Sequence, residues 1–153
     1  MAESVSSIQI RRLLSSAPEA VFRAFTEPSL LARWFSPSAD IATRVLEHDL
    51  RPGGRYRFAF RFPDGAEAVV RGEFLTIQRP RRLVVTWTWE EPDPHAGIET
   101  IVSIVLTDSG EGTEIVVTHE RFPEASVRDR HDEGWSTTLD RLEGLLTEEG
   151  DRS

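Results

Sequence analysis

Two histidines in the last third of the chain have the widest scope for chemistry. His119 follows Ile115 and Val117 at every second position, which places the three side chains on one face of a strand. Because imidazole titrates near neutral pH, His119 could orient the polar group of a ligand or transfer a proton. The alternative, which is the commoner role of a buried histidine, is a core residue whose nitrogens are hydrogen-bonded within the fold. His131 lies in a later helical pattern, but no third ligand stands at a spacing typical of metal centres, so no metal is expected.

The remaining reactive side chains form no recognisable catalytic motif. Cysteine is absent, which excludes disulfides and thiolate nucleophiles. No serine sits in a nucleophile elbow, and neither a phosphate-binding loop nor a dinucleotide fingerprint occurs, so we expect no cofactor and leave catalytic residues unknown. The net charge of −8 would repel phosphate backbones, so nucleic acid is not an expected partner. Carboxylates are scattered without a pair whose spacing shows convergence: Asp49, Glu67, Glu73, Glu90, Glu91 and Glu99.

Aromatic side chains recur where a sheet and a helix would bring them together. Sites for small apolar molecules are concave, rich in aromatic rings and sparsely polar. The same rings could instead fill a core without any ligand, because each buries about 150 to 250 Å². With His119 as the polar anchor, the residues expected to line a ligand site are Trp34, Phe58, Phe60, Trp87, Trp89, Trp135 and Leu139.

Hydrophobic periodicity predicts the elements that would position these residues. Apolar residues at helical spacing indicate two short N-terminal helices and one long C-terminal helix, and alternation indicates strands from Ala42 to about residue 121. A run of strands without intervening helices implies an antiparallel sheet. The predicted elements are a strand at 5–14, helices at 18–26 and 29–34, strands at 55–62, 66–78, 82–91, 98–107 and 113–121, and a helix at about 124–149.

Local features refine this outline. Ser16 with Glu19 three residues later resembles a capping box at the start of the first helix. Gly72 suggests a bend in its strand, because glycine inside a strand often marks a bulge or a close approach. The loop from Glu90 to Gly97 contains two prolines and would suit the mouth of a cavity.

The order of these elements, with several short segments, resembles the START-like (SRPBCC) helix-grip superfamily. More narrowly, it resembles the branch named after the homologue of the activator of the heat-shock protein 90 ATPase. The resemblance implies an α+β fold in which a curved antiparallel sheet of about six to seven strands grips the long helix over an apolar cavity. Superfamily members include carriers of hydrophobic ligands, aromatases, cyclases, hydrolase-like proteins and a co-chaperone domain. The segments that carry the resemblance are Ala17–Phe22, Leu31–Phe35, Asp49–Gly54, Arg82–Trp87, Thr113–His119, and Gly134 and Trp135 followed by Leu139 and Leu142.

We therefore expect one START-like domain over residues 1–153, with a core at about 5–148 and an acidic tail at 149–153 that frays into solvent. The predicted function is to hold an apolar or aromatic small molecule between the long helix and the sheet. Alternatives are a cyclase-, aromatase- or hydrolase-type enzyme using the same cavity, and a chaperone-related interaction module. No segment has the roughly 20 apolar residues that cross a bilayer, so we expect a cytoplasmic location without membrane insertion. Apolar residues on the outer sheet face further predict a homodimer: Ile101, Val105 and Val116.

Overall fold

The computed structural model describes residues 7–151, which form three helices and seven strands. The predicted elements are confirmed, with shifts of a few residues at their ends. Residues 5–6 of the predicted first strand and residues 152–153 of the predicted tail lie outside the described residues. In chain order the elements are β1 (Ser7–Leu14), α2 (Pro18–Thr26), α3 (Pro28–Trp34), β2 (Ala42–His48), β3 (Arg55–Arg61), β4 (Glu67–Gln78), β5 (Arg82–Trp89), β6 (Thr100–Asp108), β7 (Thr113–Glu120) and α4 (Ala125–Asp151).

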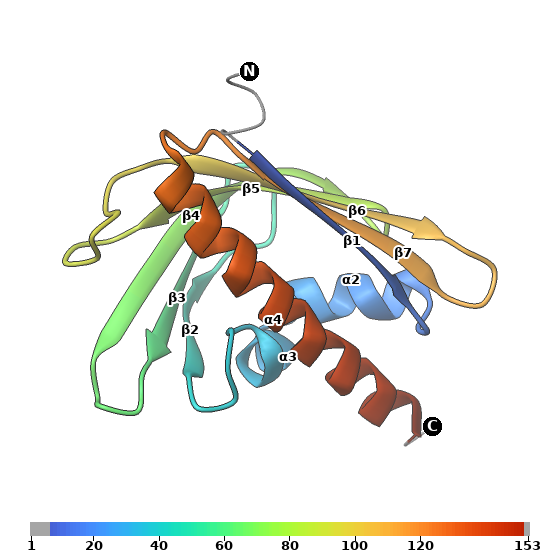
Figure 1. Ribbon diagram of the computed structural model, residues 1–153. Helices are drawn as coiled ribbons and strands as arrows, with labels where there is room; N and C mark the ends of the chain where they lie inside the picture. The colour runs from blue at the N-terminus through green and yellow to red at the C-terminus, as the bar shows by residue number, and fades with distance from the viewer. Residues whose placement is uncertain (1–6, 152–153) are drawn as a thin grey trace.

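The strands form one antiparallel sheet in the order β1-β7-β6-β5-β4-β3-β2. The sheet curves around α4, which crosses its concave side, while α2 and α3 lie beside α4 on the same side (Figure 1). Because β1 and β2 are opposite edges of the sheet, the α2–α3 segment between them must cross that open side. This architecture is the predicted helix-grip α+β fold.

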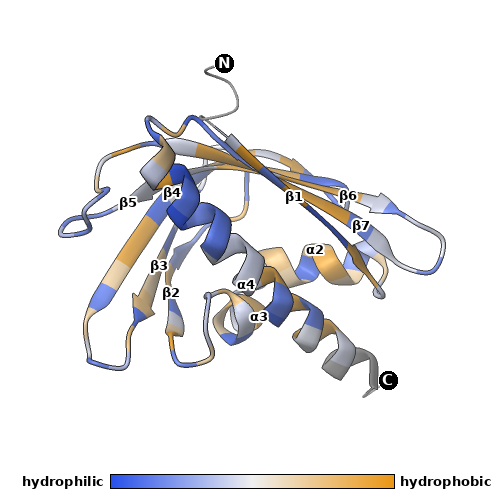
Figure 2. Ribbon diagram, viewed as in Figure 1, coloured by the Kyte–Doolittle hydropathy of each residue, from blue (hydrophilic) through white to orange (hydrophobic). Residues whose placement is uncertain are grey.

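Alternation along the strands sorts their side chains between the two faces. Ile115, Val117 and His119 of β7 are all fully buried, as their shared parity predicts. Apolar colouring follows the strands and α2, whereas the N-terminal half of α4 shows largely hydrophilic residues (Figure 2). The inner stripe of α4 is nevertheless buried at every predicted position: Val127, His131, Trp135, Leu139, Leu142 and Leu146. None of the described helices is long and apolar enough to span a membrane.

The curvature of β4 comes from a change of register near its middle. The register against β5 shifts between Phe74 and Thr76, two residues after the predicted bend. Gly72 has a different role, because a Cβ there would collide with the Thr86 carbonyl and the Tyr56 ring. Tyr56 lies across this glycine and donates its hydroxyl proton to the Thr86 carbonyl at 2.6 Å. Gly72 therefore admits a ring that ties β3 to β5.

The predicted capping box at α2 is wrong. The N-cap residue is Ala17, and no side chain caps the helix. Glu19 instead pairs with Arg79 in the turn before β5, at 2.7 Å. The Ser16 carbonyl accepts a hydrogen bond from Thr113 at 2.7 Å, so the chain entering α2 is held by β7. Glu19 and Ser16 thus bond to residues remote in sequence, Arg79 and Thr113, instead of to each other.

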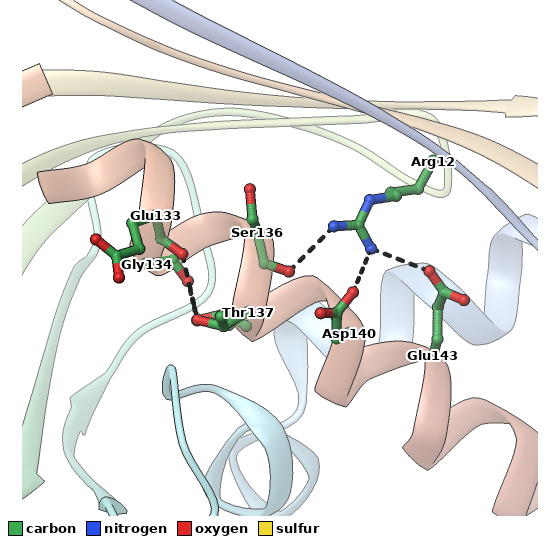
Figure 3. A network of polar contacts seen from close by, with 8 residues as sticks. Arg12, Glu133, Gly134, Ser136, Thr137, Asp140 and Glu143 are labelled. Carbon is green, nitrogen blue, oxygen red and sulfur yellow. Dashed lines mark hydrogen bonds and ion pairs between the residues drawn. The ribbon is translucent and has the colours of Figure 1, made fainter. Parts of the chain in front are cut away.

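One arginine fastens the free edge of the sheet to α4. Arg12 of β1 donates from Nη1 to Asp140 at 2.8 Å and to Glu143 at 3.1 Å, and from Nη2 to the Ser136 carbonyl at 3.1 Å (Figure 3). These acceptors span two turns of α4. The contact thus links α4 to the edge strand β1.

Candidate ligand cavity

A cavity of about 220 Å³ lies between the N-terminal half of α4 and the sheet; we call it the main cavity. Its walls come from β3, β5, α4 and the segment that joins α3 to β2. Rings dominate the lining, and the half-buried Phe62 and the exposed Pro37 mark its outer end. The lining residues are Phe35, Ser36, Pro37, Ile41, Phe60, Phe62, Trp87, Trp89, Arg130, His131, Gly134, Trp135 and Thr138.

A second, smaller cavity of about 40 Å³ lies toward α2 and the middle of the sheet; we call it the inner cavity. Its lining is apolar apart from the imidazole of His48 and the hydroxyl of Tyr56. Three residues line both cavities and so form the wall between them: Phe35, Trp87 and Trp135.

The predicted site residues fall into three groups. Phe60, Trp87, Trp89 and Trp135 line the main cavity, and Phe58 lines the inner one together with Trp87 and Trp135. Three predicted residues line neither cavity, namely Trp34, His119 and Leu139.

Packing explains why Trp34 and Leu139 stand apart. Trp34 is 1% exposed, donates its indole proton to the Ala24 carbonyl at 2.9 Å and packs edge-on against Phe25. It therefore fastens α3 to α2. Leu139 is fully buried in the solid packing beyond the cavity.

His119 lies behind the cavity wall, with both ring nitrogens engaged. Trp135 can only donate, so its Nε1–H bonds to a lone pair on His119 Nδ1 at 3.1 Å. Thr100 donates its hydroxyl proton to the Trp87 carbonyl at 3.0 Å, which leaves its oxygen to accept from His119 Nε2 at 2.6 Å. These bonds define a neutral imidazole protonated on Nε2. Burial, and then the proximity of His131, hold the pKa of His119 well below its usual value.

His131 repeats this arrangement with the opposite tautomer. The Val127 carbonyl only accepts, so His131 Nδ1 must donate to it at 2.8 Å. Nε2 then accepts the indole proton of Trp89 at 3.0 Å. Burial lowers the pKa of His131 to about 4, even though the bond to Val127 favours the protonated form. Two of the cavity tryptophans are thus oriented by histidines, while Trp87 Nε1 is buried without a partner among the described residues.

An ion pair holds the β5–β6 loop against α4 at the cavity. Arg130 donates both terminal nitrogens to Asp93, at 2.9 and 2.8 Å, and its guanidinium lies 4.8 Å from the centre of the Trp89 ring. Burial opposes ionisation of Asp93, but the bonds from Arg130 and from the His95 amide outweigh it and lower the pKa of Asp93. The predicted loop at the cavity mouth therefore contacts the lining residue Arg130, and Asp93 of the loop compensates the charge of that arginine.

Sequence reasoning missed several lining residues, above all Phe35 and Gly134. Phe35 follows Trp34 directly, and only the end of α3 decides which ring turns toward the sheet. Gly134 is visible as a glycine inside a long helical pattern, where glycine is disfavoured. An added Cβ there would meet nothing within 4 Å. That unfavourable residue was the available signal for open space beside the helix.

A curved antiparallel sheet, a long C-terminal helix and an apolar cavity between them define the helix-grip class of α+β proteins. The sequence profile of the family described as Activator of Hsp90 ATPase homolog 1-like protein matches residues 15–147, and the chain belongs to this family. The wider SRPBCC fold family often binds small hydrophobic ligands. No curated protein matches the sequence. Within residues 7–151, no group of three or more His, Asp or Glu side chains could hold a metal ion.

Solved bacterial structures share the fold. A protein from Chromobacterium violaceum is 30% identical, with a TM-score of 0.81 over 91% of this chain and 96% of its own. A protein from Nitrosomonas europaea is 31% identical, with a TM-score of 0.76 over 94% of this chain and 96% of its own. An AHSA1 protein from Silicibacter pomeroyi is 24% identical, with a TM-score of 0.83 over 94% of this chain and 99% of its own, a likeness of fold alone.

Proposed function

We propose that this protein binds a compact, uncharged apolar or aromatic molecule in the main cavity. The observation that carries the proposal is an aromatic cavity of about 220 Å³ in which His131, Trp89, Arg130 and Thr138 are hydrogen-bonded within the protein, while the Trp87 indole N–H is buried without a partner among the described residues. This volume lies between the about 150 Å³ of an engineered cavity that binds benzene and the about 300 Å³ at which pockets for drug-sized ligands begin. One or two fused rings would fill it.

The charge balance of the wall supports an uncharged ligand. Arg130 is the cation of the lining, and Asp93 already neutralises it through two hydrogen bonds. A carboxylate entering the cavity would lose its hydration without gaining a free cation, which is costly in apolar surroundings. Naphthol should therefore bind better than naphthoate, which has the same ring system with a charge.

Gly134 allows the cavity to be filled without removing any contact. Leucine at position 134 would extend from α4 into space where an added Cβ meets nothing within 4 Å. Gly144 is the matched control, because it lies in the same helix, has the same free space around an added Cβ and lines neither cavity. In calorimetric titrations with naphthol, we expect Gly134→Leu to weaken binding at least tenfold and Gly144→Leu to leave it unchanged.

Two outcomes would overturn the proposal. One is the absence of saturable binding by the unaltered protein to naphthol and other uncharged one- and two-ring compounds. The other is equal affinity of the Gly134→Leu and unaltered proteins, which would place any bound compound elsewhere. Native mass spectrometry of freshly purified protein would complement the titration, because a retained molecule identifies the ligand class directly.

An enzyme of the cyclase, aromatase or hydrolase type has less support. Such an enzyme needs a group that can exchange a proton with the ligand. His131 is the imidazole of the cavity wall, and both of its nitrogens are bonded, as are those of His119 behind the wall. A chaperone-related module would act through its surface, and the cavity gives no reason for one. We also propose a cytoplasmic location, which cell fractionation would test.

The predicted homodimer remains a separate part of the proposal. Val105 and Val116 are direct cross-strand partners on the outer face of the sheet, where Val105 is 38% exposed. Leu13 of the neighbouring edge strand is 71% exposed. Exposed apolar side chains that cluster on one face support contact with a second copy of the chain. Light scattering should give a dimer mass that Val105→Lys reduces, and a monomer mass at every concentration would remove the idea.

A further inference from the structure

The two cavities are separated by three rings, and these rings differ in how they are held. Trp135 is hydrogen-bonded to His119, and Trp87 lies on the central strand β5 among the rings of Trp89, His119 and Trp135. Phe35 has no polar atom in its side chain. Its ring is positioned by contacts with the rings of Trp34, Phe58, Phe60, Trp87 and Trp135, at centroid distances between 5.2 and 6.1 Å.

The backbone around Phe35 is fixed independently of that ring. The Phe35 amide donates to the Leu31 carbonyl at 3.0 Å, and its carbonyl accepts from Thr43 at 2.6 Å. Arg141 of α4 donates to the Ser36 hydroxyl and carbonyl and to the Arg33 carbonyl. Truncating the Phe35 side chain would therefore remove part of the wall while leaving its support in place.

We propose that Phe35 determines the length of ligand that this protein accepts, an inference that rests on the proposed function. With the ring in place, a ligand is confined to the main cavity of about 220 Å³. Without it, the main cavity and the inner cavity of about 40 Å³ join into one elongated space that also includes the volume of the ring. Most of the residues that line the extension are apolar, among them Phe25, Leu31, Phe74 and Val85, so it suits an unbranched hydrocarbon chain. Its polar groups are the Tyr56 hydroxyl, which is bonded to the Thr86 carbonyl, and His48, whose Nε2 is buried without a partner among the described residues.

Linear alcohols of increasing length test this directly. Each additional buried methylene should strengthen binding about fourfold while the chain still finds apolar space. In the unaltered protein, affinity should stop rising once the main cavity is full, so dodecanol should bind no better than hexanol. In Phe35→Ala, the ratio of dodecanol to hexanol affinity should rise at least tenfold. Leu142→Ala, which truncates a buried side chain that lines neither cavity, should not change this ratio.

Naphthol binding separates failure of this inference from failure of the proposed function. If every variant binds naphthol but Phe35→Ala keeps the alcohol ratio of the unaltered protein, Phe35 does not set ligand length. If the unaltered protein binds neither naphthol nor the alcohols, the proposed function itself fails. Should Phe35→Ala not fold, as judged by circular dichroism, Phe35→Leu offers a smaller opening, and an unchanged ratio there overturns the inference.

Discussion

The two halves of α4 face the same sheet but meet it differently. The N-terminal half carries Arg130, His131, Gly134 and Trp135, which border the main cavity. The C-terminal half presents leucines that are buried in continuous packing: Leu139, Leu142, Leu145 and Leu146. Aromatic and imidazole rings held by hydrogen bonds keep a space open, whereas branched aliphatic side chains close it. One helix thus combines a candidate binding surface with the main anchor of the fold.

The largest expected effect is on the C-terminal half. Leu142 is fully buried and lines neither cavity, so Leu142→Ala should lower the free energy of unfolding by about 2 to 5 kcal/mol. Thr138→Ala on the cavity wall should cost about 1 kcal/mol or less, because its hydroxyl bonds only to a carbonyl of its own helix. Urea denaturation measures both. Equal losses would mean that the two halves are packed alike.

The histidines predict that acid weakens the N-terminal half. Both have pKa values below that of a histidine in the unfolded chain, about 6.5. As the pH falls, the unfolded state therefore binds protons before the folded state does, which stabilises the unfolded state. Stability should be complete above about pH 7 and decline from about pH 6.5 toward the His131 pKa of about 4. At about pH 5, His131 alone should account for a loss of about 2 kcal/mol.

Urea denaturation at several pH values tests this decline, with His131→Leu as the comparison. That variant should be less stable at neutral pH, because Trp89 loses its acceptor, but its stability should fall less steeply between about pH 7 and 5. An identical slope would show that His131 does not carry the effect.

The sequence predicted which residues face inward, but not whether they meet. Period two along β7 and helical spacing along α4 identified the buried faces, including His119 and Trp135, because alternation depends only on backbone geometry. A void forms where the side chains of two facing elements are too small to fill the space between them. Its size therefore depends on the distance between the elements as well as on the side-chain volumes. That distance depends on contacts remote in sequence, such as Arg12 with Asp140.

Hydrogen-bond partners were beyond sequence reasoning for a similar reason. The hydrogen-bond partners of His119 are Trp135 of α4 and Thr100 of β6. Because both lie on other elements, the sequence around His119 does not show that its nitrogens are already bonded, and the sequence therefore left a role in ligand binding open. Trp34 and Phe35 are adjacent aromatic residues, and no periodicity in so short a helix distinguishes the ring that packs on α2 from the ring that divides the cavities. The candidate site thus depends on how the Phe35 side chain is oriented at the end of α3, where hydrophobic periodicity gives the least information.

Two glycines sharpen the comparison with a smaller effect of opposite sign. Gly134→Ala and Gly144→Ala should each raise the free energy of unfolding by about 1 kcal/mol, because alanine favours the helix and an added Cβ is unobstructed at both positions. Thermal denaturation measures the gain. A loss of stability in Gly134→Ala alone would indicate that the space beside the N-terminal half is already occupied.

The smallest expected effect concerns the arginine that spans both halves. Arg12 is 24% exposed in its side chain, but Asp140 and Glu143 are 68% and 45% exposed, so water screens both ion pairs. A double-mutant cycle of Arg12→Met with Glu143→Gln should give a coupling of about 0.5 kcal/mol at low salt and less at about 1 M salt. A coupling well above about 1 kcal/mol that persists in salt would show that this contact, rather than the leucines, anchors α4. Arg12 also contacts Ser136 in the N-terminal half of α4, beside the cavity residue Trp135. A strong Arg12 contact would therefore stabilise both halves of the helix, and the division into a binding half and a stabilising half would be wrong.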